Sequence, residues 1–342
     1  MQIRLSERAK RRWAKFRANK RGFYALIAFL SVFCLSMGAE FIANDKPLLV
    51  YYKNELYFPI LKEYPETVFG GTFETPADYT DPVVRDLIDA DGFFIMPPIP
   101  YSYDTINYRL DEPAPSPPSW ENWLGTDDLG RDVLARLLYG FRFSLLFGLV
   151  LTVFSSAFGI LAGAVQGYFG GRTDLFFQRF LEIWGNLPQL FILILVSSVI
   201  APGFWTLLFV LLLFSWTALV PIVRAEFLRA RNFDYVKAAY ALGVPNIVII
   251  FRHVFPNAMV ATLTYLPFIL SGAVVSLTAL DFLGFGLPPG SASLGELVRQ
   301  GKDNLQAPWL AAAAFVSLAF VLTSLVFIGE AVRDAFDARR EP

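Results

Sequence analysis

Residues able to carry out chemistry are scarce in this chain of 342 residues. The single cysteine, Cys34, excludes an internal disulfide and a cysteine-based metal cluster, and the single histidine, His253, leaves no histidine pair for a zinc site. The apolar runs contain no paired aspartates, and the sequence has no His-Glu-x-x-His pattern and no serine with a plausible histidine base. Metal catalysis and an intramembrane enzyme are therefore disfavoured.

The sequence also lacks a nucleotide-binding motif. The glycine cluster nearest to a phosphate-binding loop, residues 163–173, ends in Arg172 and Thr173 and contains no lysine for the phosphates. We expect this chain to bind no cofactor and to hydrolyse no ATP.

The most distinctive polar segment is Phe233–Asn257, which predicts a hairpin of two helices that contacts another protein. Asp234 can accept hydrogen bonds from the first free N–H groups of a helix. Gly243 suits a left-handed residue after the helix, and Pro245 cannot continue it. A short helix is therefore predicted over Tyr235–Leu242.

Small side chains occupy the centre of this first helix, at Ala238, Ala239 and Ala241, so another surface can approach its backbone closely. A second helix is predicted from about Asn246 to Phe255. Pro256 is compatible with the start of the helix that follows. The alternative is an ordinary helical connection between membrane spans.

The chain has the composition of a membrane protein: 55% of its residues are hydrophobic, only 17% are charged, and its mean hydropathy is +0.47. About 20 helical residues cross a bilayer. Uncharged runs occupy residues 22–39, 143–171, 183–223, 254–280 and 304–329. The run 183–223 is long enough to fold back at Ala201-Pro202-Gly203. We expect an all-α polytopic membrane protein with six transmembrane helices.

Basic residues predict the orientation. Nine of the first 21 residues are basic and five basic residues lie in 224–253, so both termini and the hairpin are expected in the cytoplasm. We interpret the first apolar run as a retained span rather than a cleaved signal peptide. The predicted order is a basic tail (1–21), the first span (22–43), an extracytoplasmic segment (44–142), helices 2–6 (143–334, with the hairpin at 224–256) and a cytoplasmic tail (335–342).

The extracytoplasmic segment is rich in proline and acidic residues, with 12 of the chain's 22 prolines and 17 acidic against 8 basic residues. Such proline density predicts an irregular segment without long helices or central strands. Its many aromatic residues predict a lobe packed on the membrane face. The lobe is either a docking surface for a soluble binding protein or a packed cap with no partner.

Two further segments carry closely spaced polar residues. In Trp123–Leu145, Asp127, Arg131, Asp132 and Arg136 predict an interfacial ion-pair cluster, and Arg142 can reach the headgroups. In Asp281–Trp309, glycines and prolines predict a re-entrant or interfacial loop shielded by protein.

The hairpin resembles the EAA loop of ABC importer permeases: two alanines, a glycine four residues later, and a hydrophobic run that closes in Val254-Phe255-Pro256. Lys237 replaces the glutamate that is usual in the family. The segments around Trp123–Leu145 and Asp281–Trp309 resemble the oligopeptide and dipeptide permeases of the C type. The first 122 residues resemble a permease whose peptide importer is associated with the antibiotic peptide microcin C.

This resemblance implies a type I ABC importer permease in the bacterial inner membrane that moves peptides, including peptides similar to microcin C. It implies four partners: a second homologous permease, a cytoplasmic ABC ATPase that binds ATP and magnesium, a periplasmic peptide-binding protein, and the peptide itself; no nucleic acid is expected. The residues expected to couple to the ATPase are Asp234, Lys237, Ala238, Ala239, Gly243, Arg252 and Pro256.

A peptide path requires hydrogen-bonding groups without strong charges. Gln166, Asn186 and Gln189 are the best candidates to line it, although interhelical packing is the alternative for each. No acidic or basic residue lies within the uncharged runs, whereas a proton- or sodium-driven carrier normally places ionisable groups or broken helices near the midplane. The rival interpretation is a secondary carrier or channel that acts alone. That rival function is therefore less well supported.

Overall fold

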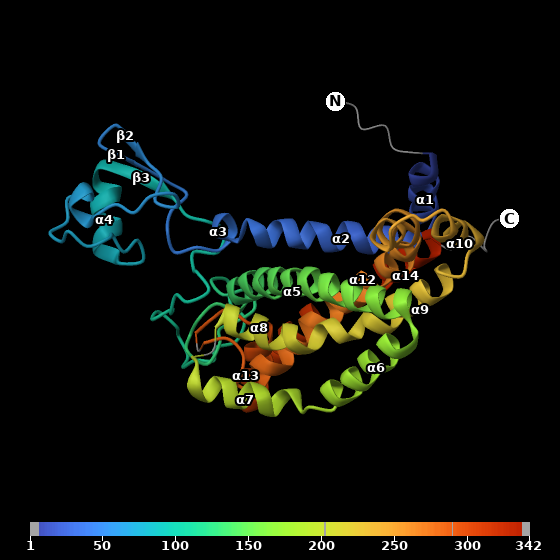
Figure 1. Ribbon diagram of the computed structural model, residues 1–342. Helices are drawn as coiled ribbons and strands as arrows, with labels where there is room; N and C mark the ends of the chain where they lie inside the picture. The colour runs from blue at the N-terminus through green and yellow to red at the C-terminus, as the bar shows by residue number, and fades with distance from the viewer. Residues whose placement is uncertain (1–6, 202, 289, 337–342) are drawn as a thin grey trace.

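The computed structural model describes residues 7–201, 203–288 and 290–336, and it shows a helical bundle with a small lobe at one end (Figure 1). Within these ranges five helical segments are long and apolar enough to cross a membrane, and two helices bent by 66° form a sixth crossing if they are one span. The predicted helical membrane protein is confirmed, with five or six crossings.

The crossings follow the chain in order. They are α2 (Lys20–Met37), α5 (Val133–Phe169), the bent pair α6 (Gly171–Gly185) and α7 (Gln189–Val199), the run α8 (Phe204–Ser215), η2 (Trp216–Ala218) and α9 (Val220–Ala230), α12 (Phe255–Phe282), and α14 (Pro308–Phe336).

The third crossing differs from the expected one. The sequence places it inside the uncharged run that begins at Ile183, whereas the structure starts it with the charged helix α6 and turns into α7. Pro188 is the N-cap residue of α7 and has no N–H to continue a helix, which explains the break. The expected turn at 201–203 follows α7, and its Pro202 lies outside the described residues.

A stripe of glycines lets α5 lie against α9. A Cβ on Gly159 would lie 2.6 Å from the Trp216 carbonyl oxygen, and a Cβ on Gly167 would lie 2.6 Å from that of Arg224. Small residues spaced by four allow such backbone approach between membrane helices. A bidentate ion pair between Arg224 and Asp174, with both N–O distances 2.6 Å, then joins α9 to α6.

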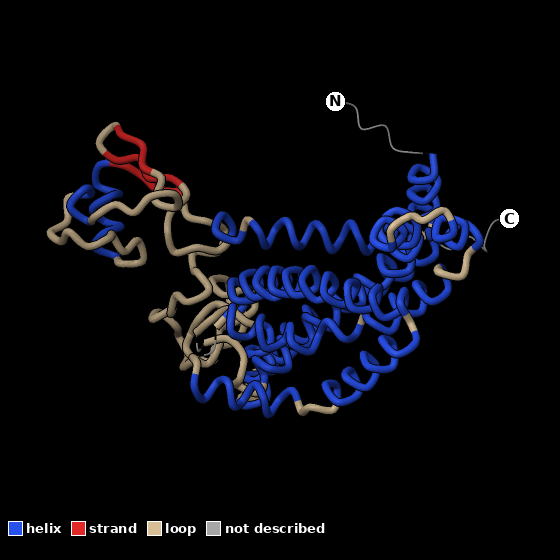
Figure 2. Tube along the Cα trace, viewed as in Figure 1, coloured by secondary structure: helices blue, strands red, loops and turns tan. Residues whose placement is uncertain are grey.

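The lobe is more ordered than predicted. It contains a three-stranded antiparallel sheet in the order β2 (Glu55–Tyr57), β1 (Leu49–Tyr52), β3 (Gly92–Ile95), together with η1 (Glu66–Phe69) and α4 (Pro82–Asp91). Figure 2 shows the three strands side by side along the upper side of the lobe, at the left of the view. The expectation of an irregular segment without a central strand is therefore wrong.

The positions of the prolines explain why strands form in this segment. None lies within the three strands, and Pro82 occupies the first turn of α4, where its missing N–H costs no hydrogen bond. Aromatic residues pack inside the lobe, where Phe69 is fully buried and makes edge-to-face contacts with Tyr52, Tyr57 and Tyr79. The predicted packing of the lobe on the membrane face stays a prediction.

The first described helix packs on the end of α14, on the side of the bundle away from the lobe (Figure 1). Helix α1 (Glu7–Ala18) packs Phe16 against Ala331 and Ala335 of α14. Residues 1–6 of the predicted basic tail lie outside the described residues, as do residues 337–342 of the C-terminal tail. Residues 335 and 336, assigned to that tail from the sequence, end α14.

Candidate functional site

The hairpin begins with α10 (Asp234–Ala241), close to the predicted first helix. Phe233 is the N-cap residue, and no side chain within the described residues caps the helix, so the predicted capping bond of Asp234 is wrong. Asp234 is instead an exposed acidic residue in the first turn, where the helix dipole favours negative charge.

The end of α10 has the predicted glycine geometry. Gly243 has a φ of +77°, its N–H donates to the Tyr240 carbonyl at 3.0 Å, and the Val244 N–H donates to the Ala239 carbonyl at 3.1 Å. These two bonds form a Schellman motif, which satisfies carbonyls at the helix end. No described atom lies within 4 Å of a Cβ added to Gly243, so backbone conformation alone requires the glycine.

The second helix of the hairpin is not separate from the membrane span. Helix α11 (Asn246–Val248) continues through a π-helical turn, Ile249–Val254, directly into α12. Pro256 lies in the first turn of α12 and has no N–H, and the wider turn before it accommodates the missing bond. Any force on the hairpin is therefore transmitted straight into a long membrane helix.

The hairpin has one face packed on the bundle and one face open. Val236 and Ala239 of α10 are buried in a cluster that also contains Ile249 and Val254. The predicted approach of a partner to Ala239 is therefore wrong, because this side chain faces inward. Ala238 is exposed, as are Lys237 and Arg252.

The open face is largely apolar. Leu242 is 83% exposed at the tip, and the most exposed of the other large side chains are Tyr240, Ile247 and Phe251. An exposed apolar patch rimmed by polar residues is typical of a site that contacts another protein or the membrane.

Polar contacts attach the hairpin to two spans. The Tyr168 hydroxyl of α5 donates to Asn246 at 2.8 Å, and Asn257 of α12 donates to the Tyr235 hydroxyl at 2.8 Å. Arg231 donates to the carbonyl of Tyr168 at 3.4 Å. The hairpin is thus linked to the ends of both α5 and α12.

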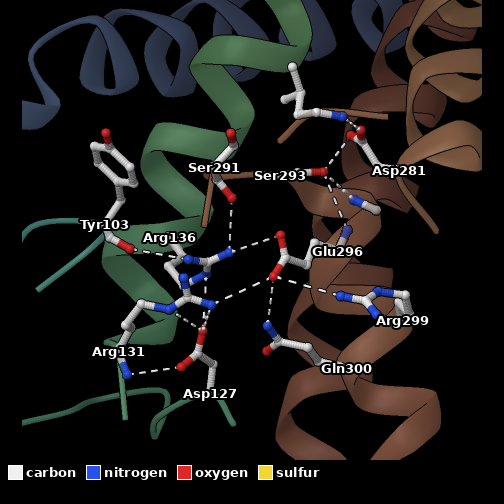
Figure 3. Close-up of polar contacts among 12 residues, drawn as sticks. Tyr103, Asp127, Arg131, Arg136, Asp281, Ser291, Ser293, Glu296, Arg299 and Gln300 are labelled. Carbon is white, nitrogen blue, oxygen red and sulfur yellow. Dashed lines mark hydrogen bonds and ion pairs between the residues drawn. The ribbon is translucent and has the colours of Figure 1, made fainter. Parts of the chain in front are cut away.

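A second polar site lies where α5 begins, at the opposite end of the bundle (Figure 3). Asp127 is fully buried and accepts from Arg131 Nε at 2.8 Å, and Arg136 Nε lies 3.3 Å from the same carboxylate oxygen. Arg136 also donates to the carbonyls of Tyr103 and Ser291, at 3.2 and 3.0 Å. The predicted ion-pair cluster is present and is buried within the protein, and its location at the membrane interface stays a prediction.

Glu296 of α13 (Leu294–Asp303) completes this cluster, with carboxylate oxygens 3.6 Å from both Arg131 and Arg136. The sequence reasoning missed this role, although Glu296 belongs to the second segment that it singled out. The predicted set of two aspartates and two arginines is already balanced in charge, so the sequence carries no signal for a further acidic residue. In the structure Asp132 caps α5, and Glu296 supplies the second negative charge.

Asp132 has a different role from the one predicted. Its carboxylate caps α5 by accepting from the Ala135 N–H at 2.7 Å, and it accepts from the amide of Asn122 at 2.8 Å. Burial raises the pKa of Asp132 above its ordinary value. Arg142, expected at the headgroups, pairs with Glu40 at 2.7 Å.

The shielded loop before the last span is held by Asp281 at the end of α12. Its carboxylate accepts from the Ser293 hydroxyl, and from the Leu287 N–H at 2.8 Å. The Ser293 hydroxyl in turn accepts from the N–H groups of Gly295 and Glu296, which starts α13. The loop and the ion-pair cluster therefore form one continuous polar network.

The three predicted path residues do not come together. Gln166 is fully buried in α5 and donates to the Asp174 carbonyl at 3.3 Å, whereas Asn186 is exposed at the break between α6 and α7. Gln189 is half-buried at the start of α7. A path lined by these residues stays a prediction.

Comparison with known proteins decides the family. Residues 138–342 match the family described as "Binding-protein-dependent transport system inner membrane component". The chain belongs to this family. The predicted resemblance is thereby confirmed.

Three relatives extend the comparison. The chain is 58% identical to the inner membrane ABC transporter permease protein YejE of Escherichia coli (strain K12), over 98% of this chain and 99% of the relative. It is 54% identical to the peptidoglycan transport system permease protein YejE of Agrobacterium fabrum (strain C58), over 98% and 94%. It is 32% identical to the oligopeptide transport system permease protein OppC of Haemophilus influenzae (strain Rd), over 70% and 77%.

Proposed function

We propose that this protein is a permease subunit of an ATP-driven ABC importer that moves peptides across the bacterial inner membrane. The hairpin carries this proposal, because it joins an exposed apolar tip to two membrane helices. The relatives' names, which include peptide and peptidoglycan transport, support the class of cargo. Peptides similar to microcin C remain a prediction from the resemblance alone.

The hairpin acts as a lever between a cytoplasmic ATPase and the spans. The ATPase would supply the sites for ATP and magnesium, and its movement would displace the tip formed by Leu242 and Tyr240. Because the π-helical turn runs into α12 and Tyr168 ties the hairpin to α5, that displacement tilts both spans. A switch between inward-open and outward-open states follows only if the tip contacts the ATPase differently in each.

A second, homologous permease is the expected neighbour within the membrane, in a six-span type I arrangement. None of the described residues of α6 is buried, and α7 buries only Leu193. An apolar groove of about 470 Å³ opens between α5, α6 and α8, lined by residues that include Phe158, Phe177 and Phe209. This groove suits an apolar helix of the second permease.

Outside the membrane, we propose that the acidic lobe is the surface on which a soluble peptide-binding protein docks. The basic residues near α1 and the hairpin support an orientation with both termini in the cytoplasm and the lobe in the periplasm.

The test is purification of the tagged chain in mild detergent, with mass spectrometry of bound proteins and an ATP-hydrolysis assay. We expect a P-loop ATPase and a second permease to be recovered with wild type and with Leu61→Ala, which changes a side chain 77% exposed in the lobe, away from both proposed contacts. Leu242→Asp should lose the ATPase and retain the second permease. A lone chain that conducts or exchanges solute after reconstitution would instead support the stand-alone carrier or channel.

A further inference from the structure

Helix α1 is held rigidly at a corner with α2. Asn19 lies between the two helices, accepts from the Gly22 N–H at 3.3 Å and donates to Asp334 of α14 at 3.4 Å. Phe16 is 6% exposed against α14, and the Arg12 guanidinium lies 4.4 Å from the ring centre of Phe336. The last turn of α1 is therefore anchored to the bundle.

The rest of α1 projects beyond the bundle. Figure 1 shows it turned away from the direction of α2 and extending past the edge of the packed helices, next to the end of α2. A helix that crosses the end of a membrane span in this way lies near the plane of the headgroups, outside the protein.

The side chains of α1 suit that position. Trp13 is 49% exposed, stacks on Phe16 at 5.5 Å between ring centres, and meets the edge of Phe23 in the first turn of α2. Tyr24, the residue after Phe23, is 65% exposed on the surface of α2. Tryptophan and tyrosine gather at the membrane interface because one part of each ring is apolar and one part is polar.

Positive charge surrounds Trp13. Residues 7–21 contain eight basic residues and one acidic residue, Glu7. At about 100° per residue, Lys10 and Arg17 fall within about 60° of Trp13, whereas Arg11 and Lys15 point to the far side of the helix. Arg17 lies 5.6 Å from the Phe23 ring, and Lys10 is exposed in a surface pair with Glu7.

We propose that α1 and the first turn of α2 form a binding site for anionic phospholipid. Lys10 and Arg17 bind the phosphate of the headgroup, and Trp13 packs on the upper part of the acyl chains. The charge is complementary, since each basic residue near an anionic membrane contributes favourably to binding. We favour a lipid over a soluble anion as the ligand. Trp13 lies against the first turn of the lipid-facing span α2, where it can contact an acyl chain but would not strengthen the binding of free phosphate.

The experiment is native mass spectrometry of the full chain, purified with the subunits it carries, titrated with dioleoylphosphatidylglycerol or dioleoylphosphatidylcholine. The double variant Lys10→Gln/Arg17→Gln is compared with the matched control Arg11→Gln/Lys15→Gln, which removes two charges from the far side of the same helix. We expect wild type and the control to prefer phosphatidylglycerol. The Lys10→Gln/Arg17→Gln variant should lose that preference, with an apparent affinity about tenfold to thirtyfold lower.

Three results would overturn the proposal. Equal losses in the two double variants would indicate general charge attraction without a site. Competition by inorganic phosphate at the same concentration as lipid would indicate a site for a soluble anion. Unchanged lipid preference with loss of a co-purifying ATPase in the Lys10→Gln/Arg17→Gln variant would assign α1 to a protein interface.

A second measurement does not depend on charge removal. In a Cys34→Ser background, a spin label at Trp13→Cys should be accessible to oxygen and shielded from a water-soluble nickel complex in nanodiscs. The same label at Arg11→Cys should show the reverse. If both labels are equally accessible to nickel, α1 does not lie in the membrane interface and the proposal fails.

Discussion

At the scale of single residues, Asp127 is the central negative charge of the buried ion-pair cluster. It is the carboxylate nearest to both Arg131 and Arg136, and all three side chains are at most 4% exposed. Asp127→Asn leaves two buried guanidinium groups with Glu296, 3.6 Å away, as their remaining ion-pair partner among the described residues. We therefore expect unfolding to become easier by about 3–5 kcal/mol. Denaturant unfolding of the detergent-solubilised chain measures this change.

The control for that prediction is Glu182→Gln. Its exposed pair with Arg179, at 2.6 Å, is screened by water and should contribute little. Similar losses of stability in the two variants would show that the buried cluster does not hold this end of the bundle together.

Gly243 gives a second prediction at this scale. Its φ of +77° costs about 1–2 kcal/mol for a residue with a Cβ, whereas asparagine tolerates this region better. Since the space around Gly243 is open, we expect transport to decrease in the order glycine, asparagine, alanine, valine. Peptide uptake at equal protein levels measures the order. Equal uptake for the asparagine and valine variants would contradict it, because the positive φ at position 243 would then not determine transport.

At the scale of elements, α10 has two adjacent alanines with opposite roles. Ala239 is buried against the cluster containing Ile249 and Val254, so Ala239→Leu should overpack it and lower stability by about 1–3 kcal/mol. Ala238 is exposed, so Ala238→Leu should leave stability unchanged and weaken ATPase binding. Thermal unfolding and ATPase co-purification separate the two effects; identical behaviour of both variants would refute the assigned faces.

The same helix shows what the sequence could predict. The position of α10, the left-handed Gly243 and the hairpin as a whole follow from local rules of helix ends. The inward direction of Ala239 does not, because it depends on packing against Ile249, a residue in another element. The bend before α7 was also missed, since Pro188 stands within an uncharged run that hydropathy alone treats as continuous.

At the scale of the whole molecule, the extracytoplasmic segment divides into parts that the sequence did not separate. Proline content predicted irregular structure throughout, but strands formed between the prolines. The ion-pair cluster also joins Arg131 to Glu296, which are 165 positions apart, and no local pattern specifies that pairing. Each polar segment could be recognised in the sequence, whereas the contact between the two segments is seen only in the structure.

This division determines how the lobe must be tested. Removing residues 46–118 would also remove Asn107 and Ser116, which are buried and hydrogen bonded to Asn122 and Thr126 beside the ion-pair cluster. A deletion of that size would damage the bundle. A smaller deletion avoids this damage. The Leu48 N–H donates to the Ile95 carbonyl at 2.8 Å, so the two ends of the segment that forms the sheet lie next to each other.

We therefore predict the outcome of replacing residues 49–95 with two glycines. The bundle, the cluster at Asp127 and ATPase co-purification should be unchanged, because their contacts come from residues outside the deletion. Peptide uptake delivered by the soluble binding protein should decrease several-fold, since the docking surface is lost. Uptake and ATPase co-purification measured on one preparation distinguish the two roles. Equal loss of both would mean that the lobe supports folding, and loss of neither would mean that the binding protein docks on the remaining loops near Trp120.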